Sequence, residues 1–306
     1  MTLHVVSVGI NLLEALRTPT RFGPLNAAVK HHGNAMRSLL PFGSDSAAAS
    51  SQLADWLPPK GAPLPHMLSL LGEVQPAKWP AGVSAELQTL DATPAFRRPL
   101  TGHDVAVLIA SDTAEGLLAA VWNAFALVRE PTQVCYLDRP EQRLAKPPTP
   151  GSAVIVRVPG MQVGTEEGFR EAMRGLGTLG RTLLDYLPPL EDCRFHLSGG
   201  FKAAIPYLVA LAEAMRSEHR SKITAWVQHE TTQGNPIRLP LRTLRRTVAQ
   251  SELAPFGPDG RSHMSSLGDG ILDGYAYERQ TDGTFRLTAF GEGLKAFFGI
   301  PPAAIG

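Results

Sequence analysis

The segment with the clearest chemical potential reads Ser-Gly-Gly-Phe-Lys and consists of Ser198, Gly199, Gly200, Phe201 and Lys202. Two adjacent glycines allow the backbone to approach a ligand closely, and the lysine falls in the first turn of the helix predicted to follow. Backbone N–H groups beside an ammonium group favour anions such as phosphates. The same residues also fit an ordinary strand-to-helix turn with a solvated lysine, so the pattern alone leaves both interpretations open.

Two further loops follow predicted strands. One comes after the apolar run 3–8 and the other after the run 104–110, and their residues are Gly9, Ile10 and Asn11 in the first and Ser111, Asp112 and Thr113 in the second. In an open parallel sheet, ligands bind outside the carboxyl ends of the strands, so all three loops occupy positions where binding is expected. For the second loop the pattern favours a plain helix N-cap over a ligand contact.

The elements that must position these loops follow from hydrophobic periodicity. Apolar runs predict strands over residues 3–9, 104–110, 132–137, 152–158, 193–197 and 223–228. Helical spacing predicts helices over residues 114–128, 166–186 and 201–216, and weaker helical patches occur between residues 22 and 80. Strands that alternate with helices predict an α/β fold in which a mostly parallel sheet carries helices on both faces.

The pattern changes near Pro240. Helices are predicted over residues 241–251, 265–272 and 291–298, and a hairpin over 275–279 and 284–288 turns at Asp282 and Gly283. This order predicts a small α+β, winged-helix-like domain over residues 241–306, which leaves residues 1–240 as the first domain. A recognition helix near residues 262–273 would permit DNA binding, but the tail has seven basic and seven acidic residues and lacks the usual positive surplus.

Composition narrows the classes of function. The 306 residues include 29 Lys and Arg against 28 Asp and Glu, a net charge of +1, which argues against a global electrostatic grip on nucleic acid or an anionic membrane. Cys135 and Cys193 are too few for a disulfide framework or a four-cysteine zinc site. The apolar runs are too short to cross a bilayer. We therefore expect a cytoplasmic protein with no membrane partner, no metal and no cofactor.

Five segments together resemble the CARF-domain family, the CRISPR-associated Rossmann-like fold that binds cyclic oligoadenylate messengers made by type III CRISPR systems. They are residues 8–13 (VGINLL), 84–90 (SAELQTL), 109–116 (IASDTAEG), 196–203 (HLSGGFKA) and 226–230 (WVQHE) followed by 237–240 (IRLP). Their order and spacing cover about the first 240 residues. The resemblance implies a Rossmann-like sheet and a homodimer in which two copies of the loops face one two-fold symmetric site.

The resemblance also implies roles for single residues. Lys202 and the backbone of residues 198–200 would hold phosphates or riboses, while Asn11 and residues 111–113 would contact the ring. Family members that cleave their ligand often carry serine at the position of Asn11, but an asparagine can still orient a hydroxyl by hydrogen bonding. The expected activity is that of a ring nuclease, with cyclic tetra-adenylate as the expected ring and with Lys202 and Asn11 as catalytic residues.

Cleavage of this kind needs neither a metal ion nor a protein nucleophile, because the ribose 2′-OH attacks the neighbouring phosphate when the geometry is in line. Residue types alone do not separate this activity from binding without cleavage. Two alternatives therefore stay open: a non-cleaving sensor that regulates transcription through the winged-helix-like tail, and an adaptor that recruits a separate effector.

Overall fold

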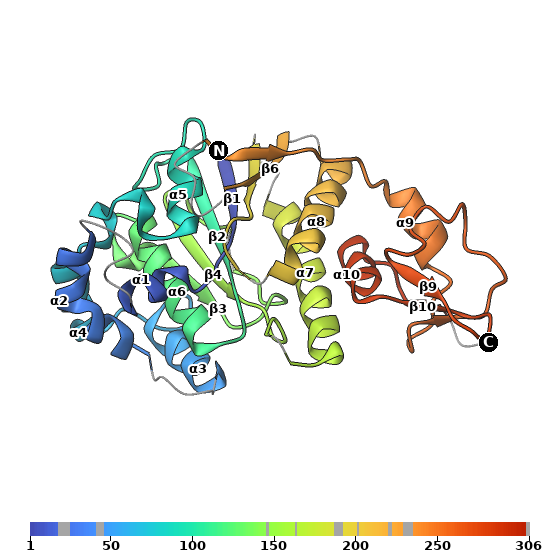
Figure 1. The fold of residues 1–306 in the computed structure, drawn as a ribbon, viewed down its shortest axis with the longest axis horizontal. Coiled ribbons are helices and arrows are strands. Elements are labelled where there is room, and N and C mark those ends of the chain that lie inside the picture. Colours follow the sequence, from blue (N-terminus) through green and yellow to red (C-terminus); the bar gives the residue numbers. More distant parts are fainter. Residues whose placement is uncertain are drawn as a thin grey trace.

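A computed structural model describes most of the chain, namely residues 1–17, 25–40, 46–144, 147–162, 164–186, 192–200, 202–219, 222–228 and 235–303. Within these ranges a central sheet carries helices on both faces, and a smaller tail follows beyond one helical layer (Figure 1). No helix in the described ranges has both the length and the apolar character that a membrane span requires.

The central sheet has seven strands in the order β3-β4-β2-β1-β5-β6-β7. All pairs are parallel except the last, in which β7 runs antiparallel to β6. The strands are β1 (Thr2–Ser7), β2 (Asp104–Ala110), β3 (Val134–Leu137), β4 (Ala153–Arg157), β5 (Asp192–His196), β6 (Lys222–Val227) and β7 (Ile237–Leu239). The predicted α/β class with a mostly parallel sheet is thereby confirmed, and the arrangement is consistent with a Rossmann-like fold.

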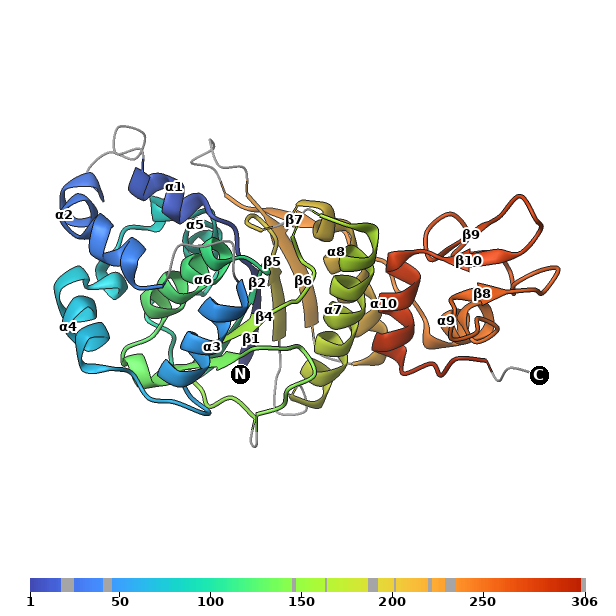
Figure 2. The same ribbon diagram turned by 90° about the horizontal axis from the view of Figure 1, so that it is seen from below.

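The strands are apolar because both faces of the sheet are covered. In β1 and just after it, Leu3 and Val5 belong to the core on one face, and Val6 and Val8 belong to the core on the other. Parallel sheets covered on both sides have near-continuous apolar strands of this kind. Figure 2 shows the sheet between the two helical layers.

The first helical layer is built from the segments between β1 and β3. Its longest uniformly buried member is α6, whose sequence is apolar on nearly every side because it lies between the sheet and another helix, α3. The helices of this layer are α1 (Asn11–Arg17), α2 (Leu25–Ser38), α3 (Ser46–Trp56), α4 (Pro65–Val74), α5 (Ala85–Ala92) and α6 (Ala114–Leu127), with short 3-10 turns η2 (Pro76–Lys78), η3 (Ala81–Val83) and η4 (Pro131–Gln133).

The second helical layer consists of α7 (Glu166–Tyr186) and α8 (Ile205–Glu218). The helix predicted over residues 166–186 is confirmed. The helix predicted over 201–216 starts later, because the chain first forms a 3-10 turn, η5 (Lys202–Ala204), and Pro206 then occupies the first turn of α8. Lys202 therefore precedes the α-helix.

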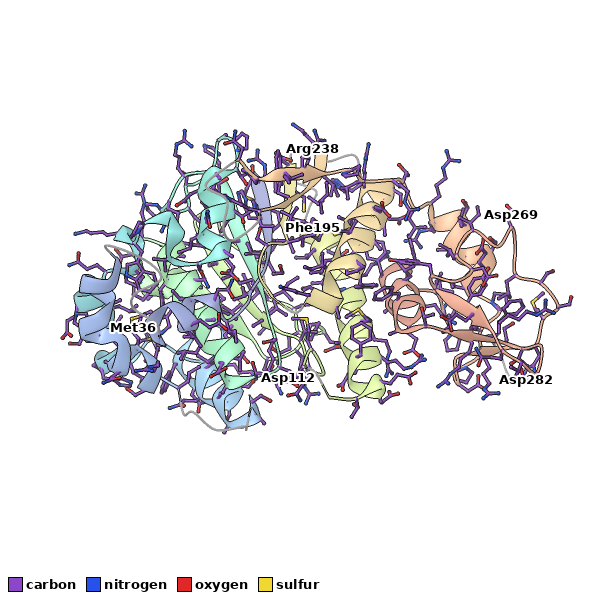
Figure 3. The ribbon with its side chains drawn as sticks, viewed as in Figure 1. Met36, Asp112, Phe195, Arg238, Asp269 and Asp282 are labelled. Carbon is purple, nitrogen blue, oxygen red and sulfur yellow. The ribbon has the colours of Figure 1, made fainter. Side chains whose placement is uncertain are left out.

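The tail consists of α9 (Arg246–Leu253), β8 (Arg261–Ser262), β9 (Tyr277–Arg279), β10 (Phe285–Leu287) and α10 (Ala289–Phe298). Its three strands form an antiparallel sheet in the order β8-β10-β9. The predicted hairpin is confirmed, since Gly283 adopts a positive φ of 83° and Thr284 N donates to Asp282 Oδ1 at 2.9 Å. In Figure 3, Asp269 and Asp282 lie at the outer end of the tail, away from the central sheet.

The helix predicted over residues 265–272 is wrong, because this described stretch contains turns instead. Gly268 and Gly270 have φ angles of 48° and 67°, outside the right-handed helical region. The fully buried side chain of Glu252 accepts hydrogen bonds from the N–H groups of Ile271 and Leu272, at 2.9 and 2.8 Å. The stretch expected to supply a recognition helix is therefore a loop tied to α9.

The tail packs on the second helical layer through α10 and α7. Gly177 of α7 faces the backbone of Gly293 in α10 so closely that a Cβ on Gly177 would overlap the Gly293 carbonyl oxygen, and a Cβ on Gly293 would lie 2.6 Å from the Met173 carbonyl oxygen. Arg170 and Arg174 of α7 both contact Glu292 of α10, at 2.7 and 3.1 Å. The apolar side chains of α10 join the same core as those of α7 and α8.

Replacing Gly293 with alanine should lower the free energy of unfolding by about 1–3 kcal/mol, because the new methyl group must push α10 away from α7. Urea unfolding would measure this change. The matched control is Gly72→Ala on α4, where a Cβ would meet nothing within 4 Å and where alanine should be neutral or stabilise by up to about 1 kcal/mol. Equal effects of the two substitutions would contradict the packing described.

A buried histidine pair connects three central strands. His4 Nδ1 lies 3.0 Å from His196 Nε2, and His4 Nε2 lies 3.4 Å from Asp104 Oδ1. Burial lowers the pKa of both histidines, more strongly for His196. Burial alone would raise the pKa of Asp104, but hydrogen bonds from His4 and Thr101 lower it. An ionised Asp104 accepts from His4 Nε2, so His4 Nδ1 accepts from His196.

Acidification should therefore destabilise the protein. The histidine pKa values are lower in the folded chain than the value of about 6.5 in an unfolded one, so below that pH the unfolded state binds more protons. The free energy of unfolding should fall with pH by up to roughly 2.7 kcal/mol per unit for two histidines. Urea unfolding between about pH 7.5 and 5.5 would measure this slope.

An NMR titration of the folded protein provides the direct check. The imidazole signals of His4 and His196 should stay those of neutral histidine below the ordinary value of about 6.5, because burial lowers both pKa values. Protonation of both His4 and His196 near the ordinary value of about 6.5 would contradict the buried pair.

Candidate functional site

The sheet order brings the three predicted loops to one edge. Strands β2, β1 and β5 are adjacent and parallel, so the loops that follow them leave the sheet at the same end. Val8 N donates to the Ile109 carbonyl oxygen at 3.0 Å, which continues the β1–β2 pairing into the loops. The first and third loops are in direct contact, because a Cβ on Gly9 would lie 2.7 Å from Gly200 N.

The glycines serve first to bring these two loops together. Gly200 has a φ of 92°, a conformation that favours glycine, and a Cβ built on it would lie 3.3 Å from both Ser7 Cβ and the Val8 carbonyl oxygen at the end of β1. Ser7 Oγ donates to the Gly199 carbonyl oxygen at 2.6 Å. The close backbone approach predicted from the double glycine is therefore made to the β1 loop.

Ser198 uses its side chain inside the protein. Its Oγ accepts a hydrogen bond from Gln228 N at 2.8 Å and lies 2.5 Å from Thr89 Oγ1, which also contacts the Ala85 carbonyl oxygen. These contacts engage the Ser198 hydroxyl within the protein.

The second loop is held by internal contacts. Asp112 is buried, and its two carboxyl oxygens accept from Arg157 Nε at 2.7 Å and from Gly160 N at 3.0 Å. Thr113 caps α6 by accepting from Gly116 N at 2.9 Å, and Ser111 Oγ lies 3.2 Å from Thr113 Oγ1. The N-cap that the sequence pattern favours is present, and Asp112 acts as an anchor for the end of β4.

Asn11 and Lys202 differ from these residues. Asn11 is the first residue of α1 and is partly exposed, and Lys202 is the exposed first residue of η5. Neither side chain makes a hydrogen bond or ion pair with the part of the chain that the structure describes. They are the two expected site residues whose polar groups are available to a ligand, while Gly9 and Ile10 border Asn11 in the same loop. Phe201 lies outside the described residues.

Sequence reasoning missed Glu86 as a part of this region. Its side chain, fully buried on α5, reaches the first loop, where Glu86 Oε1 accepts from Gly9 N at 2.7 Å. The available signal was the segment Ser-Ala-Glu, which places an acidic residue in the first helical turn, two residues after a serine N-cap. Within the described ranges, no three His, Cys, Asp or Glu side chains cluster in a way that would hold a metal ion.

The anchoring role of Asp112 can be measured with a double-mutant cycle. Asp112→Ala should lower the free energy of unfolding by about 2 kcal/mol or more, because it leaves the largely buried Arg157 guanidinium unpaired. Combining it with Arg157→Ala should cost less than the sum of the single variants, with a coupling of at least about 1 kcal/mol. Additive effects would show that the pair does not hold the loop.

The chain was also compared with known proteins. No protein-family model matches it, and no curated protein does.

Proposed function

We propose that the protein is a cytoplasmic homodimer that binds a cyclic oligoadenylate, with cyclic tetra-adenylate as the expected ring, and cleaves it without a metal ion. Cleavage would switch off the signal of a type III CRISPR system. The observation that carries the proposal is the meeting of the CARF-like loops at one edge of adjacent strands, with Asn11 and Lys202 unengaged by the described residues. In a two-fold dimer, two such edges would face a ring of matching symmetry.

The chemistry needs only groups that these loops carry. The ribose 2′ oxygen attacks the adjacent phosphorus, the bond from phosphorus to the 5′ oxygen breaks, and the product ends in a 2′,3′-cyclic phosphate. The 2′ proton is lost to solvent, and the leaving 5′ oxygen takes up a proton. Asn11 would orient the 2′-OH, and the Lys202 ammonium would stabilise negative charge that develops on the phosphoryl oxygens.

The transcription-regulator alternative is not favoured. The residues expected to form a recognition helix are a loop held by Glu252, and the tail carries no surplus of positive charge. The winged-helix-like interpretation of the tail therefore lacks the element that would enter a DNA groove. The tail has instead a packing role against α7.

Incubation with cyclic tri-, tetra- and hexa-adenylate in EDTA, followed by separation of the products, tests the proposal. We expect linear products that end in a 2′,3′-cyclic phosphate. Tight binding with an intact ring would mean that the protein is a non-cleaving sensor and not a nuclease. Absence of binding to all three rings would refute the proposal as a whole.

Lys202→Ala should slow ring cleavage by roughly 10²–10³-fold, because it removes the charge that stabilises the transition state. Thermal stability should be unchanged, since Lys202 is exposed. The matched control is Lys222→Ala, an exposed lysine at the start of β6, which should cleave like the natural protein. Unchanged turnover in Lys202→Ala would remove this residue from the mechanism.

A further inference from the structure

The strand order of the sheet reverses at the boundary between the parallel strands β1 and β5. From β1 the chain continues to β2 on one side, and from β5 it continues to β6 on the other side. β1 is connected to β2 through helices on one face, and β5 is connected to β6 through α8 on the opposite face. Open α/β sheets bind their ligands outside the carboxyl ends of the strands at such a switch point, often with an anion on free backbone N–H groups. Here the loops at this boundary are the first and the third.

The side-chain carboxyl group of Glu86 occupies this boundary. Glu86 Oε1 accepts from Gly9 N at 2.7 Å, so the amide that would face an anion already has a partner. A Cβ built on Gly199 would overlap Glu86 Oε1, and one built on Gly9 would lie 3.5 Å from it. Both glycine loops are therefore shaped around the end of the Glu86 side chain.

The helix that carries Glu86 is itself firmly held. Ser84 caps α5 by accepting from Leu87 N at 3.1 Å, and it donates to Asn123 Oδ1 of α6 at 2.7 Å. One turn after Glu86, Thr89 contacts Ser198 of the third loop. Residues three apart lie on one helix face, so a single face of α5 fixes both loops.

We propose that Glu86 is a positioning residue whose carboxyl group takes the anion position at the β1–β5 boundary, sets the spacing of the two glycine loops and excludes compact anions from it. The space is filled and the Gly9 amide is used, so inorganic phosphate has no place there. A ligand must instead bind outside the two loops, where Asn11 and Lys202 are available. This last step rests on the proposed function, whereas the placement of Glu86 does not.

Hydrogen exchange in the ligand-free protein tests the placement. In Glu86→Ala the amide of Gly9 should exchange faster by about tenfold or more, because its acceptor is gone. Glu86→Gln, which keeps an acceptor oxygen, should exchange nearly as the natural protein does. Glu86→Asp, whose shorter side chain cannot reach Gly9, should resemble Glu86→Ala and serves if that variant does not fold. If the Gly9 amide of Glu86→Asp exchanged at the same rate as in the natural protein, the inference would be overturned.

The matched control is Glu252→Gln in the tail. Glu252 is also fully buried and accepts from backbone N–H groups, but those of Ile271 and Leu272. This substitution should change exchange at residues 271 and 272 and leave Gly9 as it is. Faster exchange at Gly9 in this variant would mean that the loop responds to general loss of stability.

Binding of inorganic phosphate tests whether the Glu86 carboxyl group excludes anions from the position that it fills. Phosphate should raise the melting temperature of Glu86→Ala saturably over chloride of equal ionic strength, because it can fill the vacated position. The natural protein should show no such difference. Equal stabilisation of both proteins, or of neither, would overturn the anion-position part of the inference.

Titration with cyclic tetra-adenylate separates this inference from the proposed function. If the natural protein binds the ring, Glu86→Asp should bind it about tenfold more weakly, since the loops lose their spacing. If Glu86→Asp bound cyclic tetra-adenylate as tightly as the natural protein while its Gly9 amide exchanged faster, the role of Glu86 in ligand binding would be overturned. If the natural protein binds no ring, the proposed function fails, while the exchange and phosphate results still decide whether Glu86 holds the boundary.

Discussion

The backbone contact between Gly9 and Gly200 is the constraint on which the candidate site depends. Two neighbouring parallel strands end at the same level, and their loops can approach this closely only because neither residue carries a side chain. Ser7 ties the third loop to the end of β1, and Ser198 is tied in turn to α5 and to β6. The side chains of Asn11 and Lys202 are therefore presented from a backbone that has little freedom to adjust.

Buried carboxyl groups hold loops at several places in this protein. Asp112 holds the end of β4, Glu86 holds the β1 loop, and Glu252 holds the long turn of the tail, each by accepting at least one backbone N–H. A buried backbone N–H group without an acceptor costs free energy. A buried carboxylate that accepts from such a group therefore favours one conformation of an otherwise irregular segment.

The sequence predicted the central strands and the main helices well, because their signals are local. The strand over residues 104–110 and the helix over 166–186 have continuous periodicity and clear ends. The adjacency of β2, β1 and β5 was not readable from periodicity, since it is a property of the sheet order; only the family resemblance implied it. The Ser-Asp-Thr loop was ambiguous, and its capping role became visible only with the partners of Asp112.

Two features lay beyond sequence reasoning for a physical reason. The helix expected over residues 265–272 fails because a distant glutamate, Glu252, competes for its backbone N–H groups, and two glycines take positive φ angles there. The position of Glu86 depends on a contact between α5 and a loop that lies 77 residues earlier. Neither partner can be inferred from the residues around it.

The crossing of α7 and α10 has a consequence for the divergence of related sequences. Gly177 and Gly293 leave no space for each other's side chains, so neither position can accept a larger residue unless the other helix shifts. Drift at these two sites is therefore coupled, whereas Asp269 and Asp282 lie at the outer end of the tail, away from this crossing (Figure 3). Homologues should thus be recognisable by small residues along this crossing even where their tail tips share no similarity.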